Sequence, residues 1–254
     1  MVSADADIAG CAALVARGDP ERFRATMLAP VELRRMLLPL YAFNLEVARV
    51  PWLTKEALIA EMRLQWWRDA LAEIAAGGPV RRHEVVAPLA AAVDRRGARD
   101  LDDLVEARRA DIAGAPLDDR AALLRYLDRT AGTLLWTAAR LAGAGDEPAI
   151  RDAGLAQGAA AWLRAAPDLA ARGRQVFPPG EPSVERAALA RAGLEALERF
   201  RQARVEPSAR PVLLALVDTP ATLRAALAGR DVGRLLNPLA IQIRLGWAAL
   251  TGRI

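Results

Sequence analysis

The chain is poor in cysteine, histidine and lysine. Cys11 is its only cysteine and His83 its only histidine among 254 residues. No intramolecular disulfide can therefore form, and no Cys/His set can hold a structural zinc ion. Catalysis that needs a histidine base has only His83 to draw on. That residue follows the turn Gly77–Pro79, where a lone histidine is most often an ordinary surface or helix-start residue.

An excess of charge of one sign is also lacking. The 35 basic and 31 acidic residues leave a formal net charge of +4, and every basic residue except Lys55 is arginine. Acidic and basic residues are interleaved along most of the chain, as in Arg99–Asp103. Such interleaving is typical of solvated helix faces. Nucleic acid binding would need an undiluted basic face, so we expect no nucleic acid partner.

Long hydrophobic runs are absent too. Uncharged stretches such as Met36–Leu45 and Leu235–Ile243 are about half of the roughly 20 residues that a membrane span needs. The first residues carry acid where a targeting presequence carries base, which predicts no cleavable leader. We therefore expect a protein that stays inside the cell, either soluble or lying on a membrane.

The apolar residues of the chain recur with the spacing of an α-helix. Ile59, Met62, Trp66 and Ala70 lie on one stripe of a helix, and no comparable run of alternating β-branched residues is present. Glycine and proline separate the periodic segments, so the sequence predicts an all-α fold of about ten helices. The expected helices lie near residues 8–17, 31–50, 55–76, 84–96, 101–113, 118–143, 147–165, 183–204, 208–217, 220–229 and 238–251.

One short acidic motif could hold a metal ion. Asp102, Asp103 and Glu106 would lie within one turn of each other on a helix, and such carboxylates could hold a hydrated Mg²⁺ ion bound to a diphosphate. Arginines flank the motif, so a salt-bridged solvated face is the alternative. No glycine-rich phosphate loop of the P-loop or dinucleotide type is present.

Several segments together resemble the squalene/phytoene synthase family. Residues 30–44 read PVELRRMLLPLYAFN and residues 63–69 read RLQWWRD. Members of that family have a Tyr-Ala-Phe-Cys-Arg helix, directly followed by an aspartate cluster, and then a Trp-Arg helix. The acidic helix at 101–112, Tyr126 with the following Ala-Gly pair, and the segment GRQVFP at 173–178 match further family features in the same order. The resemblance implies a single domain over 1–254, an isoprenoid-synthase-like helical bundle with a central cavity.

The resemblance also shows what has been lost. Active members of the family hold Mg²⁺ and an allylic diphosphate between two aspartate-rich helices, since hard cations need carboxylate oxygens. In this chain the residues at the matching positions are Ala48, Arg49 and Trp52 in the first cluster, and Ala161, Ala165 and Leu169 in the second. The resemblance therefore implies a catalytically inactive protein that has no metal ion and no other cofactor.

Several residues that match the family's motifs remain candidates for lining the cavity. Leu134 or Leu135 replaces a family glycine and would crowd a pocket built for a prenyl chain. A hydrophobic or prenyl chain is still the ligand that such a cavity would accept. The candidate cavity residues are Tyr41, Phe43, Glu46, Trp67, Arg68, Tyr126 and Arg164.

Within the family, the chain is most similar to a divergent branch, that of the mitochondrial complex I assembly factors and their bacterial relatives. That resemblance implies a binding or assembly protein whose partner is a complex I subunit or assembly intermediate. It also implies a cytoplasmic location with peripheral contact at the inner membrane. Leu239, Ile243 and Trp247 share one stripe of the last expected helix, which either closes the core or faces a bilayer.

The alternative is an active, Mg²⁺-dependent prenyl-diphosphate transferase of the squalene/phytoene synthase type. Its substrate would be farnesyl or geranylgeranyl diphosphate, and its metal would need acids outside the two clusters. The acids available for that role are Glu46, Asp69, Asp102, Asp103, Asp111 and Asp168.

Overall fold

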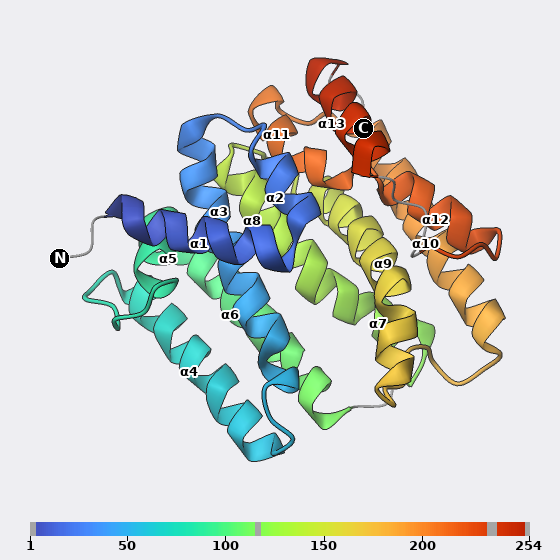
Figure 1. Ribbon diagram of the computed structural model, residues 1–254, viewed down its shortest axis with the longest axis horizontal. Coiled ribbons are helices and arrows are strands. Elements are labelled where there is room, and N and C mark those ends of the chain that lie inside the picture. The colour runs from blue at the N-terminus through green and yellow to red at the C-terminus, as the bar shows by residue number, and fades with distance from the viewer. Residues whose placement is uncertain (1–3, 115–117, 233–237, 252–254) are drawn as a thin grey trace.

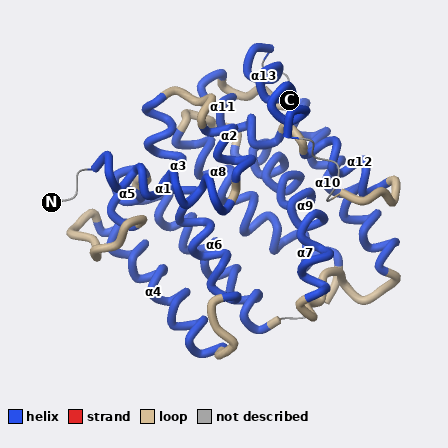
Figure 2. The backbone as a smooth tube through the Cα atoms, in the orientation of Figure 1, coloured by secondary structure: helices blue, strands red, loops and turns tan. Residues whose placement is uncertain are grey.

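The protein is built from helices. The computed structural model describes residues 4–114, 118–232 and 238–251. Within these ranges every regular element is a helix, as the uniform colour of the elements in Figure 2 shows. The predicted all-α fold is therefore confirmed.

The helices follow one another with short connections. The α-helices are α1 (Ala4–Gly18), α2 (Pro20–Thr26), α3 (Val31–Arg49), α4 (Ala57–Ala76), α5 (Val86–Ala92), α6 (Arg95–Ala113), α7 (Arg120–Leu127), α8 (Thr133–Leu141), α9 (Glu147–Ala171), α10 (Pro182–Gln202), α11 (Arg210–Leu213), α12 (Thr219–Leu227) and α13 (Pro238–Thr251). The shorter elements are η1 (Val50–Trp52), η2 (Asp128–Gly132), η3 (Pro207–Ala209) and η4 (Leu214–Leu216).

Helices that are consecutive or next but one in the sequence pack in pairs around the main core. Helix α4 packs on α6, α10 on α9, and α1 on α3. In Figure 1, α3 and α9 flank the middle of the molecule, α4 lies at its outer left, and α10 and α12 lie at its outer right. The main apolar cluster extends from Cys11 in α1 to Val232, and a second, small cluster joins α13 to Ala25 and Leu214.

Helix boundaries differ from the expected ones at several places. The expected helix 118–143 is divided by η2, and the expected helix 208–217 is divided into η3, α11 and η4. Helix α2 was not predicted, although Asp19 caps it by accepting a hydrogen bond from the Arg22 amide at 2.9 Å. The expected helix 84–96 breaks before Asp94, whose carboxylate caps α6 through the Gly97 amide at 2.8 Å. Helix α9 runs on to Ala171, beyond the expected end near residue 165, and contains Pro167 within it.

A π-helical turn, η2, joins α7 to α8 and lies directly against α9. The contact is close because both sides carry small residues: a Cβ added at Gly154 would lie 2.6 Å from Gly132 Cα, and one at Gly158 would lie 2.7 Å from Ala131 Cβ. Such π turns often occur at functional sites. Here the turn brings the side chains of η2 and α9 together on one wall of the cavity described next.

Candidate functional site

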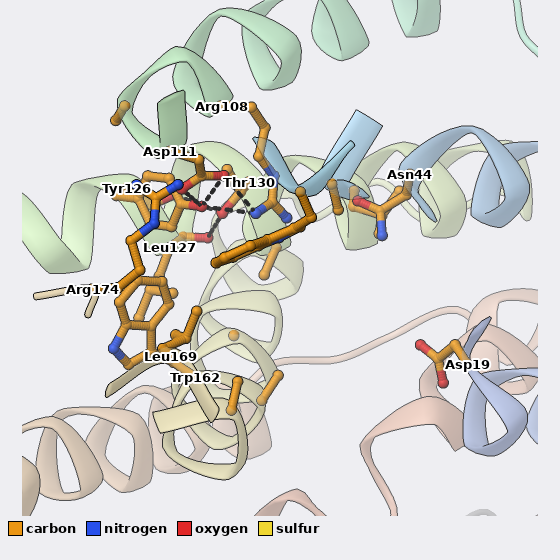
Figure 3. Close-up of a pocket in the computed structure, with 18 of the residues that line it drawn as sticks. Asp19, Asn44, Arg108, Asp111, Tyr126, Leu127, Thr130, Trp162, Leu169 and Arg174 are labelled. Atoms are coloured by element: carbon orange, nitrogen blue, oxygen red, sulfur yellow. Dashed lines mark hydrogen bonds and ion pairs between the residues drawn. The ribbon is translucent and has the colours of Figure 1, made fainter. Parts of the chain in front are cut away.

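A cavity of about 380 Å³ lies in the middle of the bundle. Its volume falls within the range of small-molecule sites, roughly 300–1,000 Å³. Figure 3 shows Arg108, Asp111, Tyr126 and Arg174 gathered on one side of it, with Asn44 and Asp19 on the opposite side. The lining comprises Asp19, Arg22, Asn44, Ala48, Trp52, Arg108, Ala110, Asp111, Gly114, Tyr126, Leu127, Thr130, Ala131, Leu134, Gly158, Ala161, Trp162, Ala165, Leu169, Arg174 and Gln175.

Five of the six positions that match the family's aspartate clusters border this cavity. Ala48 and Trp52 contribute from α3 and η1, and Ala161, Ala165 and Leu169 from α9. None of these side chains has an oxygen atom, and Mg²⁺ binds oxygen ligands. The sixth position, Arg49, lies outside the lining and forms an ion pair of 2.6 Å with Glu46. The arrangement therefore keeps the space between the two helices and offers no carboxylate at these positions.

The polar side of the cavity is a network of three side chains. Tyr126 Oη donates to Asp111 Oδ1 at 2.7 Å, and Arg108 Nη1 donates to Tyr126 Oη at 2.7 Å and to Asp111 Oδ2 at 3.2 Å. Burial raises the pKa of Tyr126, and the neighbouring Tyr126 and Asp111 raise the pKa of Arg108 despite its burial. The carboxylate of Asp111 is thus already paired with the Arg108 guanidinium and accepts a hydrogen bond from the Tyr126 phenol.

Two further arginines lie beside Trp52. The guanidinium carbon atoms of Arg172 and Arg174 lie 4.8 and 5.0 Å from the centre of the Trp52 ring, within the range of cation–π attraction. The segment that carries these arginines is tied back to α9, because Trp162 Nε1 donates to the Val176 carbonyl at 2.8 Å. Among the described residues neither arginine has an acidic partner, so this part of the cavity has an excess of positive charge.

Most of the predicted cavity residues lie away from the cavity. Of the seven, Tyr126 borders the cavity, and the other six do not. Tyr41, Phe43 and Trp67 are buried in the core, where the Phe43 and Trp67 rings meet edge to face at 5.4 Å. Arg164 lies on α9 but forms a 3.2 Å ion pair with Glu21 of α2.

Glu46 and Arg68 also have partners away from the cavity. Glu46 is buried beside Arg49, and its burial raises the pKa of the carboxyl. Arg68 donates to both oxygens of Asp102 at 2.7 and 2.9 Å, and to Glu106 at 2.6 Å. The motif considered for metal binding therefore forms an ion-pair network between α4 and α6.

The acids considered for a relocated metal site are scattered. Asp111 borders the cavity, while Asp69, Asp102 and Asp103 line a separate groove between α4 and α6. The remaining two, Glu46 and Asp168, line neither. Across the part of the chain that the structure describes, no three His, Cys, Asp or Glu side chains are grouped closely enough to hold a metal ion.

Histidine 83 lies at the start of α5, outside the cavity. Its Nδ1 atom accepts a hydrogen bond from the Val85 amide at 3.1 Å, and its ring packs against Trp66 and Trp67 at about 5 Å. Burial lowers the pKa of His83 below its ordinary value. These contacts agree with the interpretation of His83 as a helix-start residue.

Seven polar or charged cavity residues were not among the predicted candidates: Asp19, Arg22, Asn44, Arg108, Thr130, Arg174 and Gln175. Asn44 is adjacent to the Tyr-Ala-Phe motif and Arg174 lies within the GRQVFP segment, so both were inside recognised motifs. Arg22 lies on the unpredicted helix α2, where it pairs with Asp19 at 3.2 Å and covers the Tyr41 ring at 5.0 Å.

The last helix has two different faces. Leu245 and Ala248 of α13 are buried against Ala25 and Leu214. Ile243 and Trp247 point away from that contact and are 72% and 66% exposed. The third predicted membrane-facing residue, Leu239, has a side chain outside the described residues. Among the described residues no helix is long and apolar enough to cross a membrane.

A family model and several curated proteins match the chain. The model of the squalene/phytoene synthase family matches residues 15–249. NADH dehydrogenase (ubiquinone) complex I, assembly factor 6 is 31% identical in mouse over 181 residues, covering 69% of this chain and 54% of that protein. The human protein of that name is 31% identical over 66% of this chain and 52% of its own length, and the Drosophila homologue is 33% identical over the same shares.

The solved structures give the same fold. A dehydrosqualene synthase crystallised with a ligand superposes with a TM-score of 0.78 at 14% identity, and the match covers 98% of both chains. At that identity the likeness concerns the fold alone. The chain spans about half the length of the curated relatives that it matches.

Proposed function

Because the chain belongs to the squalene/phytoene synthase family, we propose that it keeps the family's cavity without its metal-dependent chemistry and acts as an assembly factor for respiratory complex I. The observation that carries the proposal is that apolar side chains occupy the positions that match the family's aspartate clusters. Ala48, Trp52 and Ala165 border the cavity where a magnesium-dependent enzyme needs carboxylates. Without those ligands a leaving diphosphate has no cation to neutralise it.

The assembly role is supported by the names of the relatives. The mouse, human and Drosophila proteins that match are named complex I assembly factor 6 or its homologue. The partner we propose is therefore a complex I subunit or an assembly intermediate. Deleting the gene in its source organism tests this role. We expect NADH:quinone oxidoreductase activity of the membranes to fall and to return when the gene is restored, while succinate:quinone oxidoreductase activity stays unchanged. Equal loss of both activities would contradict the proposal.

The absence of prenyl transfer is tested separately on the purified protein. Farnesyl diphosphate is incubated with the protein over a series of Mg²⁺ concentrations, and released pyrophosphate is measured. We expect no release above the protein-free control. Release that depends on Mg²⁺ would establish the alternative enzyme with relocated acids, and Asp111 would be the first residue to examine, since it borders the cavity.

The cavity itself suits an apolar chain with an anionic head. Its walls are apolar at Leu127, Leu134 and Leu169, and its polar side carries Arg108 and Arg174. In place of a metal ion, guanidinium groups would then meet the anion, because charge-assisted hydrogen bonds from arginine suit carboxylates and phosphates. Calorimetric titration with farnesyl diphosphate tests this arrangement. We expect binding of equal strength with Mg²⁺ and with EDTA, and binding only with Mg²⁺ would contradict it.

Contact with a membrane is part of the proposed role, since respiratory complex I biogenesis takes place at the inner membrane. The outer face of α13, with Ile243 and Trp247 exposed, is one surface that would suit it. Whether α13 meets a bilayer remains a prediction. A second surface is argued next.

A further inference from the structure

Large apolar side chains are exposed in an unusual concentration where α3 passes into α4. Trp52, Leu53, Leu58, Ile59 and Met62 are all exposed, with Leu58 at 73% and Met62 at 64%. We call these five residues the η1–α4 patch. Single exposed apolar residues are normal on a protein surface, whereas a cluster of them marks an interaction site. Helical spacing places Leu58 and Met62 one turn apart on the same face of α4, and η1 packs directly against α4.

The patch adjoins the cavity. Trp52 belongs to both, since it also lines the cavity wall. Figure 1 shows the α3–α4 connection at the lower end of the molecule, on the same side as the C-terminal ends of α6 and α9. Gly114 at the end of α6 and Leu169 near the end of α9 line the cavity there. An apolar surface bound to the patch would thus lie beside the cavity.

The charges around the patch are mainly positive. Lys55, Arg63 and Arg172 are exposed, and no described acidic residue pairs with them. Of the two acids in the same stretch, Glu61 lies 3.5 Å from Arg109. Glu56 and Asp168, the latter one turn before Arg172, are exposed and have no cationic partner among the described residues. The surplus of unpaired cations fits an anionic surface.

The geometry points to an anionic lipid bilayer as the occupant of the η1–α4 patch, bound peripherally. Tryptophan and leucine or isoleucine side chains enter the interfacial region of a bilayer, while flanking lysine and arginine remain at the headgroups. The contact of the Trp52 ring with Arg172 and Arg174 combines both features in one place. Bound in this way, the protein would present its cavity beside the lipid surface.

The outer face of α13 is the competing surface and is less suited. Its exposed residues Ile243 and Trp247 are accompanied by Arg244, which is already paired with the buried Asp218 at 3.1 Å. The η1–α4 patch has more apolar residues and cations without acidic partners. We therefore assign the bilayer contact to the η1–α4 patch.

Vesicle sedimentation of the full chain tests the assignment. The vesicles are either phosphatidylcholine alone or equal parts of phosphatidylcholine and phosphatidylglycerol. We expect the protein to sediment with the anionic vesicles, and the double variant Leu58→Gln/Met62→Gln to lose about tenfold or more in partitioning. The matched control Val184→Gln/Leu227→Gln alters two exposed apolar residues on α10 and α12 and should bind like the wild type.

A second variant and a footprint test the same surface independently. Lys55→Gln/Arg63→Gln should weaken binding to anionic vesicles by about tenfold and leave the weak binding to neutral vesicles unchanged. Because Lys55 is the only lysine, its acetylation by an amine reagent can be followed by mass spectrometry. Anionic vesicles should slow that acetylation severalfold.

Three results would overturn the assignment. These are a wild-type protein that binds no vesicles, a Leu58→Gln/Met62→Gln variant that binds as well as its control, and a loss of binding confined to Ile243→Gln/Trp247→Gln. If the patch variant lost a protein partner and kept vesicle binding, the patch would be a protein interface and the assignment would also fail. None of these measurements depends on complex I, so the assembly role can hold or fail separately.

Discussion

Tyr126 donates a hydrogen bond to Asp111, with Oη 2.7 Å from Oδ1. Burial raises the pKa of Tyr126, so the phenol remains protonated at neutral pH and the bond persists. Arg108 donates to the same Tyr126 oxygen at 2.7 Å. The Asp111 carboxylate thus accepts hydrogen bonds from Tyr126 and Arg108. These bonds occupy the oxygen atoms that would otherwise bind a metal cation.

The first prediction concerns that network. Tyr126→Phe removes the hydroxyl that bridges Arg108 and Asp111. The half-buried Asp111 carboxylate and Arg108 guanidinium each lose one hydrogen bond. We expect the free energy of unfolding to fall by about 1–2 kcal/mol, measured by urea unfolding. Tyr41→Phe is the matched control, since among the described residues the Tyr41 hydroxyl has no hydrogen-bond partner. An equal loss in both variants would contradict the role given to the network.

The second prediction concerns the contact between α9 and η2. A Cβ at Gly154 would lie 2.6 Å from Gly132 Cα and 3.0 Å from the Ala131 carbonyl oxygen. Backbone atoms cannot rotate away, so Gly154→Ala should lower the free energy of unfolding by about 1–3 kcal/mol. Gly10→Ala in α1 is the control, because its Cβ would meet nothing within 4 Å. There alanine's better helix propensity should raise stability by about 0.5–1 kcal/mol. Similar effects in both variants would show that the close contact is absent.

The third prediction concerns Arg174, which stacks on Trp52 at the cavity. If it meets the anionic head of a ligand, Arg174→Gln removes a charge-assisted hydrogen bond worth about 1.5–3 kcal/mol. We expect the Kd for farnesyl diphosphate in EDTA to rise about tenfold or more, measured by calorimetry. Arg191→Gln on the exposed side of α10 should leave the Kd unchanged. An unchanged Kd in Arg174→Gln would exclude that arginine from the anion site.

Much of the fold follows from the sequence, but only part of the site does. The helical period and the glycine and proline breaks predict the all-α fold and most helices, since both depend on local spacing. The lining of the cavity depends on helix rotation, where one residue turns a side chain by about 100°. Glu46 and Ala48 are only two positions apart on α3, yet Ala48 lines the cavity and Glu46 pairs with Arg49 outside it.

Long-range contacts limit the prediction further. Arg68 lies in a recognised motif, but its role is set by Asp102 and Glu106, more than 30 positions away along the chain. Arg174 lies in a connection whose course depends on the hydrogen bond from Trp162 to the Val176 carbonyl. Neither partnership has a local signal in the sequence. A family motif can therefore predict which residues lie near the cavity. Which of their side chains line it is decided by long-range contacts and is seen only in the folded structure.

The fourth prediction concerns acid stability at the start of α6. Asp94 pairs with Arg140, with Oδ1 2.5 Å from Nη2 and Oδ2 2.8 Å from Nη1, and the pair lowers the pKa of Asp94 to about 2. The unfolded carboxyl has a pKa of about 3.9, so the pair's stabilisation is fully present above about pH 4. It is lost as the pH falls toward 2. Because the Asp94 side chain is 55% exposed, solvent screening limits the contribution to about 1 kcal/mol or less.

Asp94→Asn isolates that charge, because asparagine also caps helices well and can still accept the hydrogen bond from the Gly97 amide. Urea unfolding at pH 7 should show the variant to be less stable than the wild type. Below the folded pKa the Asp94 carboxyl of the wild type is itself neutral, so the difference should shrink as the pH falls to 2 and disappear below it. Asp94→Ala removes the cap as well, and should retain a deficit of about 1 kcal/mol at that pH. A constant difference between Asp94→Asn and the wild type across this pH range would mean that the ion pair adds nothing to stability.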